Sequence, residues 1–153
     1  MASYSARVLW RRGSDEKMTD RRYSRAHEWI FDGGLVVPAS PSPHIVPLPY
    51  SDAANVDPEE AFVAALSSCH MLFFLHYMTD EGYVVDVYDD NATGRMEKNE
   101  SGRFWMSKVI LDPQVSYLGE YPDPSLEAAI HHRAHEDCFI ANSVRTEVVM
   151  KNS

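Results

Sequence analysis

One stretch of the sequence, residues 57–79, constrains the fold more than any other part of the chain: DPEEAFVAALSSCHMLFFLHYMT. It opens with three helix-start signals, namely an N-cap at Asp57, a first-turn proline at Pro58, and Glu60 where a capping box closes. The residues beyond are apolar on every side of a helix, a pattern typical of a helix enclosed by protein. Polar residues interrupt the run, so it lacks the roughly 20 unbroken apolar residues of a membrane span. We therefore expect a buried central helix and no membrane association.

Composition narrows the class of protein. The chain has 153 residues, which suits a single domain over 1–153, and a formal net charge of −9. Nucleic-acid binding relies on clustered Lys and Arg, so this charge argues against nucleic acid as a partner. The first ten residues, MASYSARVLW, contain no apolar segment of the kind that a secretory signal needs. We expect a cytoplasmic protein.

Two strands, over 3–12 and 22–31, are expected before the helix as an antiparallel hairpin, with a polar turn at 13–20 between them. The second strand ends at the Asp-Gly-Gly turn of residues 32–34. The segment 36–56 then holds five prolines, which exclude a helix and confine any strand to a sheet edge. Loops of this length are uncommon within a domain. The sequence leaves open whether this one is a plain surface connection or a wall of a binding site.

Beyond the helix, Gly82 is a stop signal. We expect a strand over 84–96, a hairpin turn at 97–102, a long strand with a bulge or a change of face over 103–117, and a closing strand over 145–151. A second helix begins at the Asp123-Pro124 pair. Its expected core-facing residues are Leu126, Ala129, Ile130, Ala134 and Cys138, and those nearer solvent are His131, His132 and Glu136. The order β-β-α-β-β-α-β has no repeated βαβ units and predicts an α+β fold.

The chain contains two cysteines, Cys69 in the middle of the apolar helix and Cys138 in the second helical pattern. In a cytosolic protein such a pair is a better candidate for redox or metal chemistry than for a structural staple. A zinc site is one alternative, because His131 and His135 lie on one helix face and Cys138 follows, with Cys69 or His70 as the fourth ligand. Another leaves both cysteines as small buried hydrophobes of a structural or ligand-binding protein.

The motifs around the two cysteines resemble a known family. The first is Asp57-Pro58-Glu59-Glu60 followed by Ala64-Ala65-Leu66-Ser67-Ser68-Cys69-His70-Met71, and the second is Ala134-His135 with Cys138 through Ser143. Together they look like the superfamily of osmotically inducible protein C and the organic hydroperoxide resistance proteins (OsmC/Ohr). The resemblance extends over nearly the whole chain. It implies an OsmC-like fold, in which antiparallel sheets surround a buried central helix.

This resemblance also implies a function, the thiol-dependent reduction of organic hydroperoxides. Cys69 would be the peroxidatic cysteine, oxidised to a sulfenic acid, and Cys138 the resolving cysteine that forms a disulfide with it. The resemblance further implies a homodimer with active sites at the interface, a dithiol or protein electron donor, and neither cofactor nor metal. The chemistry suits these residues independently, since a nearby second thiol protects a sulfenic acid from irreversible over-oxidation.

A buried thiol needs a cationic neighbour to act as a nucleophile. In the family this is an arginine held by the glutamate that corresponds to Glu59. Some members carry the arginine just before that glutamate, but residues 44–56 contain none here. The best replacement is Arg25, in the expected second strand, and Arg21 and Arg22 are weaker candidates.

Glu59 and Cys69 are ten residues apart, which is about 15 Å along a straight helix. The two side chains therefore cannot touch directly. Either the helix breaks near Ser67-Ser68, or the arginine spans part of the gap.

Overall fold

Residues 1–151 are described by a computed structural model, and their contacts divide the chain into two compact units, Met1–Ala61 and Phe62–Ser153. Helices and strands are mixed in the order βββ-α-ββββ-α-β, followed through the described residues with one short 3-10 turn before the last strand. Strands and helices are segregated rather than alternating as βαβ units. The predicted α+β class is confirmed.

The first unit is built on a small antiparallel sheet of β1 (Ala6–Leu9), β2 (His27–Phe31) and β3 (Val36–Ala39), in that spatial order. The predicted hairpin of the first two strands is confirmed, but both strands are shorter than expected. The Trp10 indole donates to the Ser24 carbonyl at 2.9 Å, and the Ser24 N–H donates to the Glu16 carboxylate at 2.6 Å. The Trp10 and Glu16 side chains thus occupy the backbone hydrogen-bonding groups of Ser24, and the pairing of β1 with β2 ends at Leu9.

The Pro-rich segment contains a strand that the sequence did not predict. Pro38 lies within β3, which is an edge strand of the sheet, where a residue without an N–H is tolerated. Just beyond it, Ala39 and Ser40 are fully buried. The Ser40 N–H donates to the Val56 carbonyl at 3.0 Å, and the Ser40 hydroxyl accepts from the Asp52 N–H at 2.8 Å. The connection is thus folded onto its own unit by hydrogen bonds that local patterns do not reveal.

Helix α1 (Pro58–Asp80) begins and ends where the sequence predicted. Asp57 and Glu60 form the capping box: the Asp57 side chain accepts from the Glu60 N–H at 2.8 Å, and the Glu60 side chain accepts from the Asp57 N–H at 3.3 Å. Gly82, with a φ of 84°, ends the helix, and its N–H donates to the Thr79 carbonyl at 3.0 Å. Only glycine adopts this left-handed conformation without strain. The helix is continuous, so the break considered near Ser67-Ser68 does not occur.

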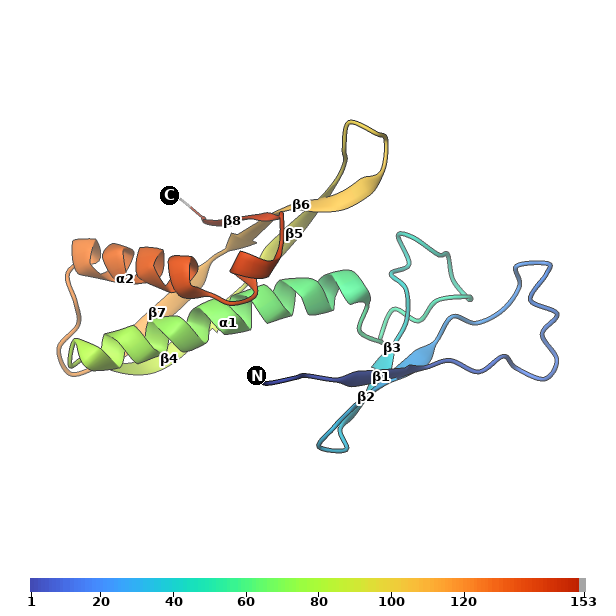
Figure 1. The fold of residues 1–153 in the computed structure, drawn as a ribbon, viewed down its shortest axis with the longest axis horizontal. Helices are drawn as coiled ribbons and strands as arrows, with labels where there is room; N and C mark the ends of the chain where they lie inside the picture. The colour runs from blue at the N-terminus through green and yellow to red at the C-terminus, as the bar shows by residue number, and fades with distance from the viewer. Residues whose placement is uncertain (152–153) are drawn as a thin grey trace. The chain divides into compact units, whose positions relative to one another are not determined.

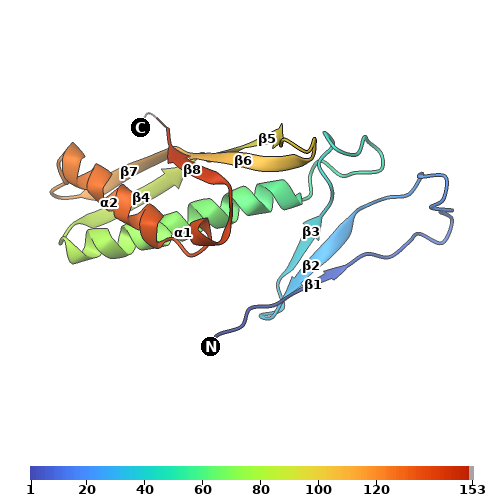
Figure 2. The same cartoon turned by 45° about the horizontal axis from the view of Figure 1, so that its top comes forward.

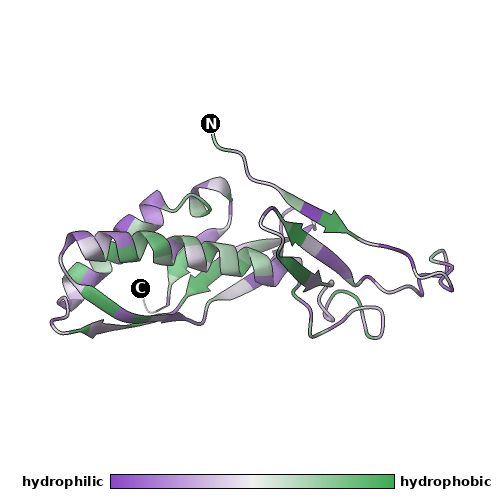
Figure 3. Ribbon diagram, turned by 90° about the horizontal axis from the view of Figure 1, so that it is seen from below, coloured by the Kyte–Doolittle hydropathy of each residue, from purple (hydrophilic) through white to green (hydrophobic). Residues whose placement is uncertain are grey.

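Only one side of α1 is buried, although Figure 3 shows most of the helix coloured as hydrophobic. The buried residues are Leu66, His70, Phe74, Tyr77 and Met78. Leu72, by contrast, is 60% exposed. The expectation of a helix enclosed on all sides is therefore wrong for the single chain. By length and composition alone α1 also passes as a membrane-crossing helix, a test that the core helix of a soluble protein passes as well.

Two long expected strands are each divided in two. Residues 84–96 form β4 (Val84–Asp90) and the start of β5 (Thr93–Lys98), and residues 103–117 form β6 (Phe104–Leu111) and β7 (Pro113–Leu118). β4 pairs antiparallel with β7, and β5 pairs antiparallel with β6 in a second sheet. β8 (Glu147–Met150) joins that second sheet parallel to β6, which departs from the all-antiparallel expectation.

Asp90 marks the division between the two sheets. One oxygen of its carboxylate accepts from the Asp112 N–H at 2.6 Å, and the other accepts from the Ser67 hydroxyl of α1. Nearby, a Cβ on Gly94 of β5 would lie 2.8 Å from a Val63 methyl of α1, so the helix and strand approach closely only because this residue is glycine. α1 is therefore fixed against both sheets at their junction.

Helix α2 (Pro124–Asp137) begins at the predicted cap, where the Asp123 carboxylate accepts from the Leu126 N–H at 2.9 Å. It lies beside the C-terminal half of α1 (Figures 1 and 2), and a 3-10 turn (Ala141–Ser143) follows it. Of the residues predicted to face the core, Ile130, Ala134 and Cys138 are buried, and Leu126 is half-buried. Two assignments are wrong: Ala129 is exposed and His131 is buried.

Candidate functional site

The structure brings the two cysteines together in the second unit. Cys69, midway along α1, is half-buried, and Cys138, which ends α2, is buried with 1% exposure. Both are free thiols, and a side-chain hydrogen bond with Cys69 is among the causes that raise the pKa of Cys138. Two residues far apart in the sequence therefore lie close together through the packing of α2 on α1.

The surroundings of Cys138 keep it protonated at neutral pH. Burial raises the pKa of its thiol to about 11, and the hydrogen bond with Cys69 acts in the same direction. The Ala141 N–H donates to Cys138 Sγ at 3.4 Å, which offsets this effect only in part. A thiol with such a pKa is a poor first nucleophile.

Two buried histidines lie beside the cysteines. His70 Nε2 and His131 Nδ1 are 2.9 Å apart, and the rings lie nearly parallel with centroids separated by 5.2 Å. Burial lowers the pKa of both histidines to about 4, and for His70 the neighbouring His131 contributes further. Both are therefore neutral at pH 7, and neither supplies the positive charge that would stabilise a thiolate.

An aromatic pair borders the cysteines on the same two segments. Phe73 follows Cys69 by one helical turn, and Phe139 follows Cys138 directly. Their rings meet edge to face with centroids 5.0 Å apart, while Phe139 remains 71% exposed. An exposed aromatic side chain thus directly follows Cys138, and such apolar surface suits an apolar ligand.

Arg25 belongs to the first unit and lies just before β2, not within a strand as expected. Its Nη1 donates to the carbonyls of Arg21 and Tyr23, at 2.9 and 2.6 Å. Its guanidinium also lies over the Tyr23 ring, 3.6 Å from the centroid, and 5.7 Å from the Tyr50 centroid. Arg25 is therefore held within its own unit by two carbonyl groups and by cation–π contacts with two tyrosine rings.

Glu59 is the second residue of α1 and also belongs to the first unit. It is half-buried, and its carboxylate makes no hydrogen bond or ion pair within residues 1–151. Because α1 is continuous, about 15 Å of helix separate Glu59 from Cys69. The break near Ser67-Ser68, one of the two explanations that the sequence left open, is therefore excluded.

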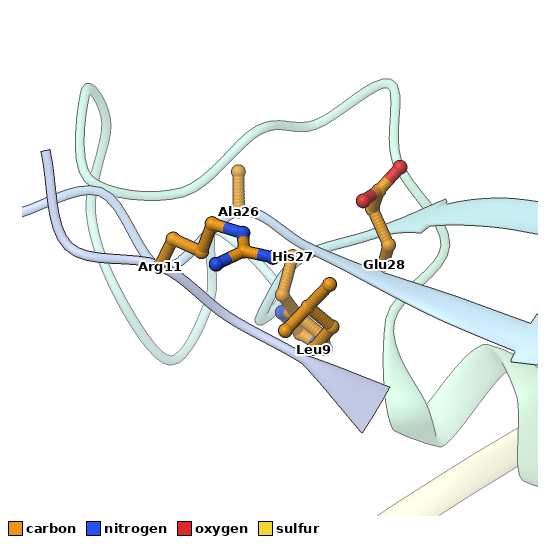
Figure 4. Close-up of a pocket in the computed structure, with 5 residues that line it drawn as sticks. All are labelled: Leu9, Arg11, Ala26, His27 and Glu28. Carbon is orange, nitrogen blue, oxygen red and sulfur yellow. The ribbon is translucent and has the colours of Figure 1, made fainter. Parts of the chain in front are cut away.

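A pocket of about 280 Å³ lies in the first unit, at the end of the β1–β2 hairpin (Figure 4). It is lined by Leu9, Arg11, Ala26, His27 and Glu28. The His27 ring is held on both sides, since its Nδ1 lies 2.8 Å from the Arg25 carbonyl and its Nε2 accepts from the Trp29 indole at 3.2 Å. None of the four predicted site residues lines this pocket.

The residues of the zinc alternative do not gather into one cluster in the structure. Over residues 1–151, no three His, Cys, Asp or Glu side chains are arranged to hold a metal ion. The His131 imidazole bonds His70 instead, because a buried polar side chain requires a hydrogen-bond partner.

Sequence reasoning missed the His70–His131 pair and the role of Asp90. One signal was available for His70. It stands four residues after Leu66 and four before Phe74, in the buried stripe of α1, and a polar side chain at a core position requires a hydrogen-bond partner. No local signal pointed to His131 as that partner.

Comparison with known proteins relates the chain to one family. Residues 51–152 match the family model described as OsmC-like protein. An OsmC-like protein of unknown function from Vibrio cholerae shares 55% identity over 99% of each chain, with a TM-score of 0.96. Comparison with the curated proteins finds no match.

Two more distant structures share the fold. An organic hydroperoxide resistance protein from Elizabethkingia anophelis, with thiocyanate bound, is 15% identical over 100% of this chain and 98% of its own, with a TM-score of 0.71. A putative organic hydroperoxide resistance protein from Vibrio cholerae, with captopril in one of its active sites, is 16% identical over 100% and 95%, with a TM-score of 0.68. The family model over residues 51–152 and the 55% identical Vibrio cholerae structure show that the chain belongs to the OsmC-like family.

Proposed function

We propose that this protein is a thiol-dependent peroxidase that reduces organic hydroperoxides, with Cys69 as the peroxidatic cysteine and Cys138 as the resolving cysteine. The observation that carries the proposal is the proximity of the two free thiols, of which Cys69 lies on α1 and Cys138 at the end of α2. Membership of a family that includes organic hydroperoxide resistance proteins supports it.

The reaction has two oxidative steps. The Cys69 thiolate attacks the terminal peroxide oxygen, the O–O bond breaks, and the alkoxide takes up a proton and leaves as an alcohol, so that Cys69 becomes a sulfenic acid. The Cys138 sulfur then attacks the Cys69 sulfur, the S–O bond breaks, and water leaves with the proton of the Cys138 thiol. A dithiol or protein donor returns two electrons to the disulfide and is itself oxidised to a disulfide.

The two environments favour this division of roles. Cys69 is half-buried and therefore reachable by a substrate, whereas Cys138 is buried. The raised pKa of Cys138 keeps it protonated until a sulfenic acid is present next to it. Neither step calls for a metal or an organic cofactor.

Activation of Cys69 requires a positive charge, because the neighbouring histidines are neutral. We assign this charge to Arg25, with Glu59 as the carboxylate that holds it. A guanidinium suits the task because it is always charged and can bond a carboxylate and a thiolate at the same time. Its terminal nitrogen Nη1 already binds two carbonyls, which leaves Nη2 for this role.

The preferred substrate class is apolar. The exposed Phe139 ring, which meets the half-buried Phe73, supports an organic hydroperoxide over hydrogen peroxide, because it would lose exposed area on contact with an alkyl or aryl group.

We also propose that the chain acts as a cytoplasmic homodimer, each subunit forming one OsmC-like domain over 1–153. The support is the apolar side of α1 that the single chain leaves exposed, with Leu72 at its centre. The homodimer places the active sites at its interface. The negative net charge and the buried histidine within α1 support a role without nucleic acid or membrane.

A non-catalytic ligand-binding protein is the second candidate. The observation that favours it is the local engagement of Arg25 by two carbonyls and two tyrosine rings. In that case the apolar surface at the cysteines would bind a ligand without chemistry.

A peroxide-consumption assay separates the two candidates. We expect faster turnover with tert-butyl hydroperoxide than with hydrogen peroxide, and faster turnover with a dithiol donor than with a monothiol. Cys69→Ser should abolish activity, and Cys138→Ser should leave only the first oxidation. Activity indistinguishable from that of Cys69→Ser for both peroxides and both donors would favour the binding protein.

A further inference from the structure

The buried His70–His131 pair joins the two helices that carry the cysteines. His70 is adjacent to Cys69 on α1, and His131 precedes Cys138 by seven residues, about two helical turns, on the buried side of α2. The two rings are 1% and 8% exposed, and their facing nitrogens are 2.9 Å apart. The hydrogen bond therefore lies at the contact between α1 and α2 (Figures 1 and 2).

The other contacts between these helices specify their relative position less strictly. Most are apolar, involving Phe74 and Met78 of α1 with Ile130 and Ala134 of α2, and apolar burial is not directional. Within the described chain, the Tyr77 hydroxyl of α1 donates to Asp137 of α2, and Tyr77 also bonds Arg133, whose guanidinium lies 3.8 Å from the Tyr77 ring centroid. Both of these α2 side chains are exposed to competing water. The buried, directional contact is the histidine pair.

We propose that the His70–His131 hydrogen bond positions Cys138 against Cys69, and that it does so only while both imidazoles are neutral. This proposal rests on the proposed function, because it assigns two positioning residues to the step that forms the disulfide. It also gives that step an acid limit that depends on neither cysteine.

The requirement for neutrality follows from the protons of the pair. Two neutral imidazoles supply one N–H donor and one bare acceptor to the shared bond. A first extra proton places a buried charge on the pair, and His70 Nδ1 has no partner within the described residues to stabilise it. A second extra proton puts hydrogens on both facing nitrogens. The acceptor is then lost, and the two positively charged rings repel each other.

The charged and titratable groups around the pair influence the pH at which the two histidines become protonated. His135 of α2 makes protonation of His70 harder, and Asp90 of β4 makes it easier, while Tyr88 of β4 lies against Phe74 with its hydroxyl also unpartnered in the described chain. Burial outweighs Asp90, because the pKa of both histidines is lowered to about 4. The pair is thus neutral at pH 7 and becomes protonated as the pH falls toward 4.

The test is the equilibrium constant for the Cys69–Cys138 disulfide in glutathione redox buffers between pH 7 and 4, with a diselenide catalyst to keep exchange fast in acid. It requires no peroxide and no activity. One variant, His70→Leu with His131→Leu, replaces both rings by apolar side chains. A second, His70→Gln with His131→Asn, places amide groups where the facing nitrogens stood. It thereby retains a hydrogen bond between groups that do not take up a proton between pH 7 and 4. The matched control is His132→Leu, on the exposed side of α2.

At pH 7 we expect the leucine variant to lower the constant at least tenfold, and the amide variant and His132→Leu to stay within about twofold of the wild type. Toward pH 4, within the range where circular dichroism shows the fold intact, the wild-type constant should fall at least tenfold further than that of the amide variant. A purely structural role would not produce this difference in pH profile. If the leucine variant does not fold, the comparison of wild type with the amide variant still decides.

Equal constants for all four proteins at pH 7, or equal acid profiles for the wild type and the amide variant, would overturn the proposal. No disulfide in any of the proteins would overturn it together with the two-cysteine cycle. A disulfide that follows the expected pattern in a protein without peroxidase activity would support the positioning role and overturn the proposed function alone.

Discussion

The Ser67 hydroxyl on α1 donates a hydrogen bond to the carboxylate of Asp90, at the point where β4 gives way to β5. The same carboxylate accepts from the Asp112 N–H between β6 and β7. The Asp90 side chain thus joins the cysteine-bearing helix to the junction between the β4–β7 sheet and the β5–β6 sheet. This polar contact holds α1 at Ser67, two residues before Cys69.

Asp90→Ala should therefore destabilise the fold. It would leave the Ser67 hydroxyl and the Asp112 N–H without their acceptor, for which we expect a loss of about 3 kcal/mol in the free energy of unfolding. Urea denaturation followed by circular dichroism measures the change. The control is Asp89→Ala, since Asp89 is the exposed neighbour on the same strand. A similar loss in both variants would contradict the role given to Asp90.

One equivalent of an organic hydroperoxide should consume both thiols of the reduced protein. Because the Cys69 and Cys138 side chains lie close together, the expected product is an intramolecular disulfide, with a mass lower by two hydrogens per chain. Intact-mass spectrometry under non-reducing conditions detects it, and a dithiol should restore the original mass. Two free thiols after peroxide treatment would rule out the two-cysteine cycle.

Arg25→Met should shift the alkylation of Cys69 to higher pH and slow the peroxide step by about tenfold or more. The reason is the loss of the positive charge that stabilises a thiolate. Glu59→Gln should act in the same direction more weakly, by releasing the arginine. The measurement is the pH dependence of alkylation in a Cys138→Ser background, with Arg7→Met as the exposed control. An unchanged profile in Arg25→Met would eliminate Arg25 and turn attention to Arg21, to Arg22 or to an arginine of the partner subunit.

The stability of the protein should fall in acid because of the histidine pair. The folded-state pKa of His70 and His131 is lowered to about 4 from 6.5, so the unfolded chain binds more protons between these values. The stabilisation is complete above about pH 6.5 and is lost as the pH falls toward 4, by an amount on the order of a few kcal/mol for the pair at pH 4.5. Urea denaturation at pH 7 and pH 4.5 measures it. The variant His70→Gln with His131→Asn should lose much less, and an equal loss in both proteins would assign the acid sensitivity elsewhere.

Leu72→Glu should convert the proposed dimer to a monomer. Leu72 is 60% exposed on an apolar side of α1, and a carboxylate buried against a second subunit would be unpaired. Light scattering coupled to gel filtration gives the mass of each species. Leu118→Glu is the matched control, a leucine equally exposed at the end of β7. A wild-type protein that elutes as a 17.4 kDa monomer would contradict the dimer directly.

The local elements were predictable because their signals act within a few residues. The Asp57 cap with Glu60 and the Gly82 stop define α1, and the Asp123 cap starts α2, each through hydrogen bonds between near neighbours. Hairpins and the α+β class follow from alternation and turns in the same way. The motifs around Cys69 and Cys138 were sufficient to indicate the OsmC-like family, which the comparisons then showed.

The sequence by itself determined where α1 begins and ends, where α2 begins and which family the chain belongs to, whereas the tertiary structure decided which side chains meet. His131 was expected near solvent but is buried because His70, 61 positions earlier, accepts or donates its hydrogen bond. The long strands were expected to be continuous but divide at Asp90 and Asp112, whose hydrogen bond spans 22 positions. α1 was expected to be enclosed, yet the chain covers only one side. Each of these outcomes depends on partners distant in the sequence, and a pattern of neighbouring residues carries no information about them.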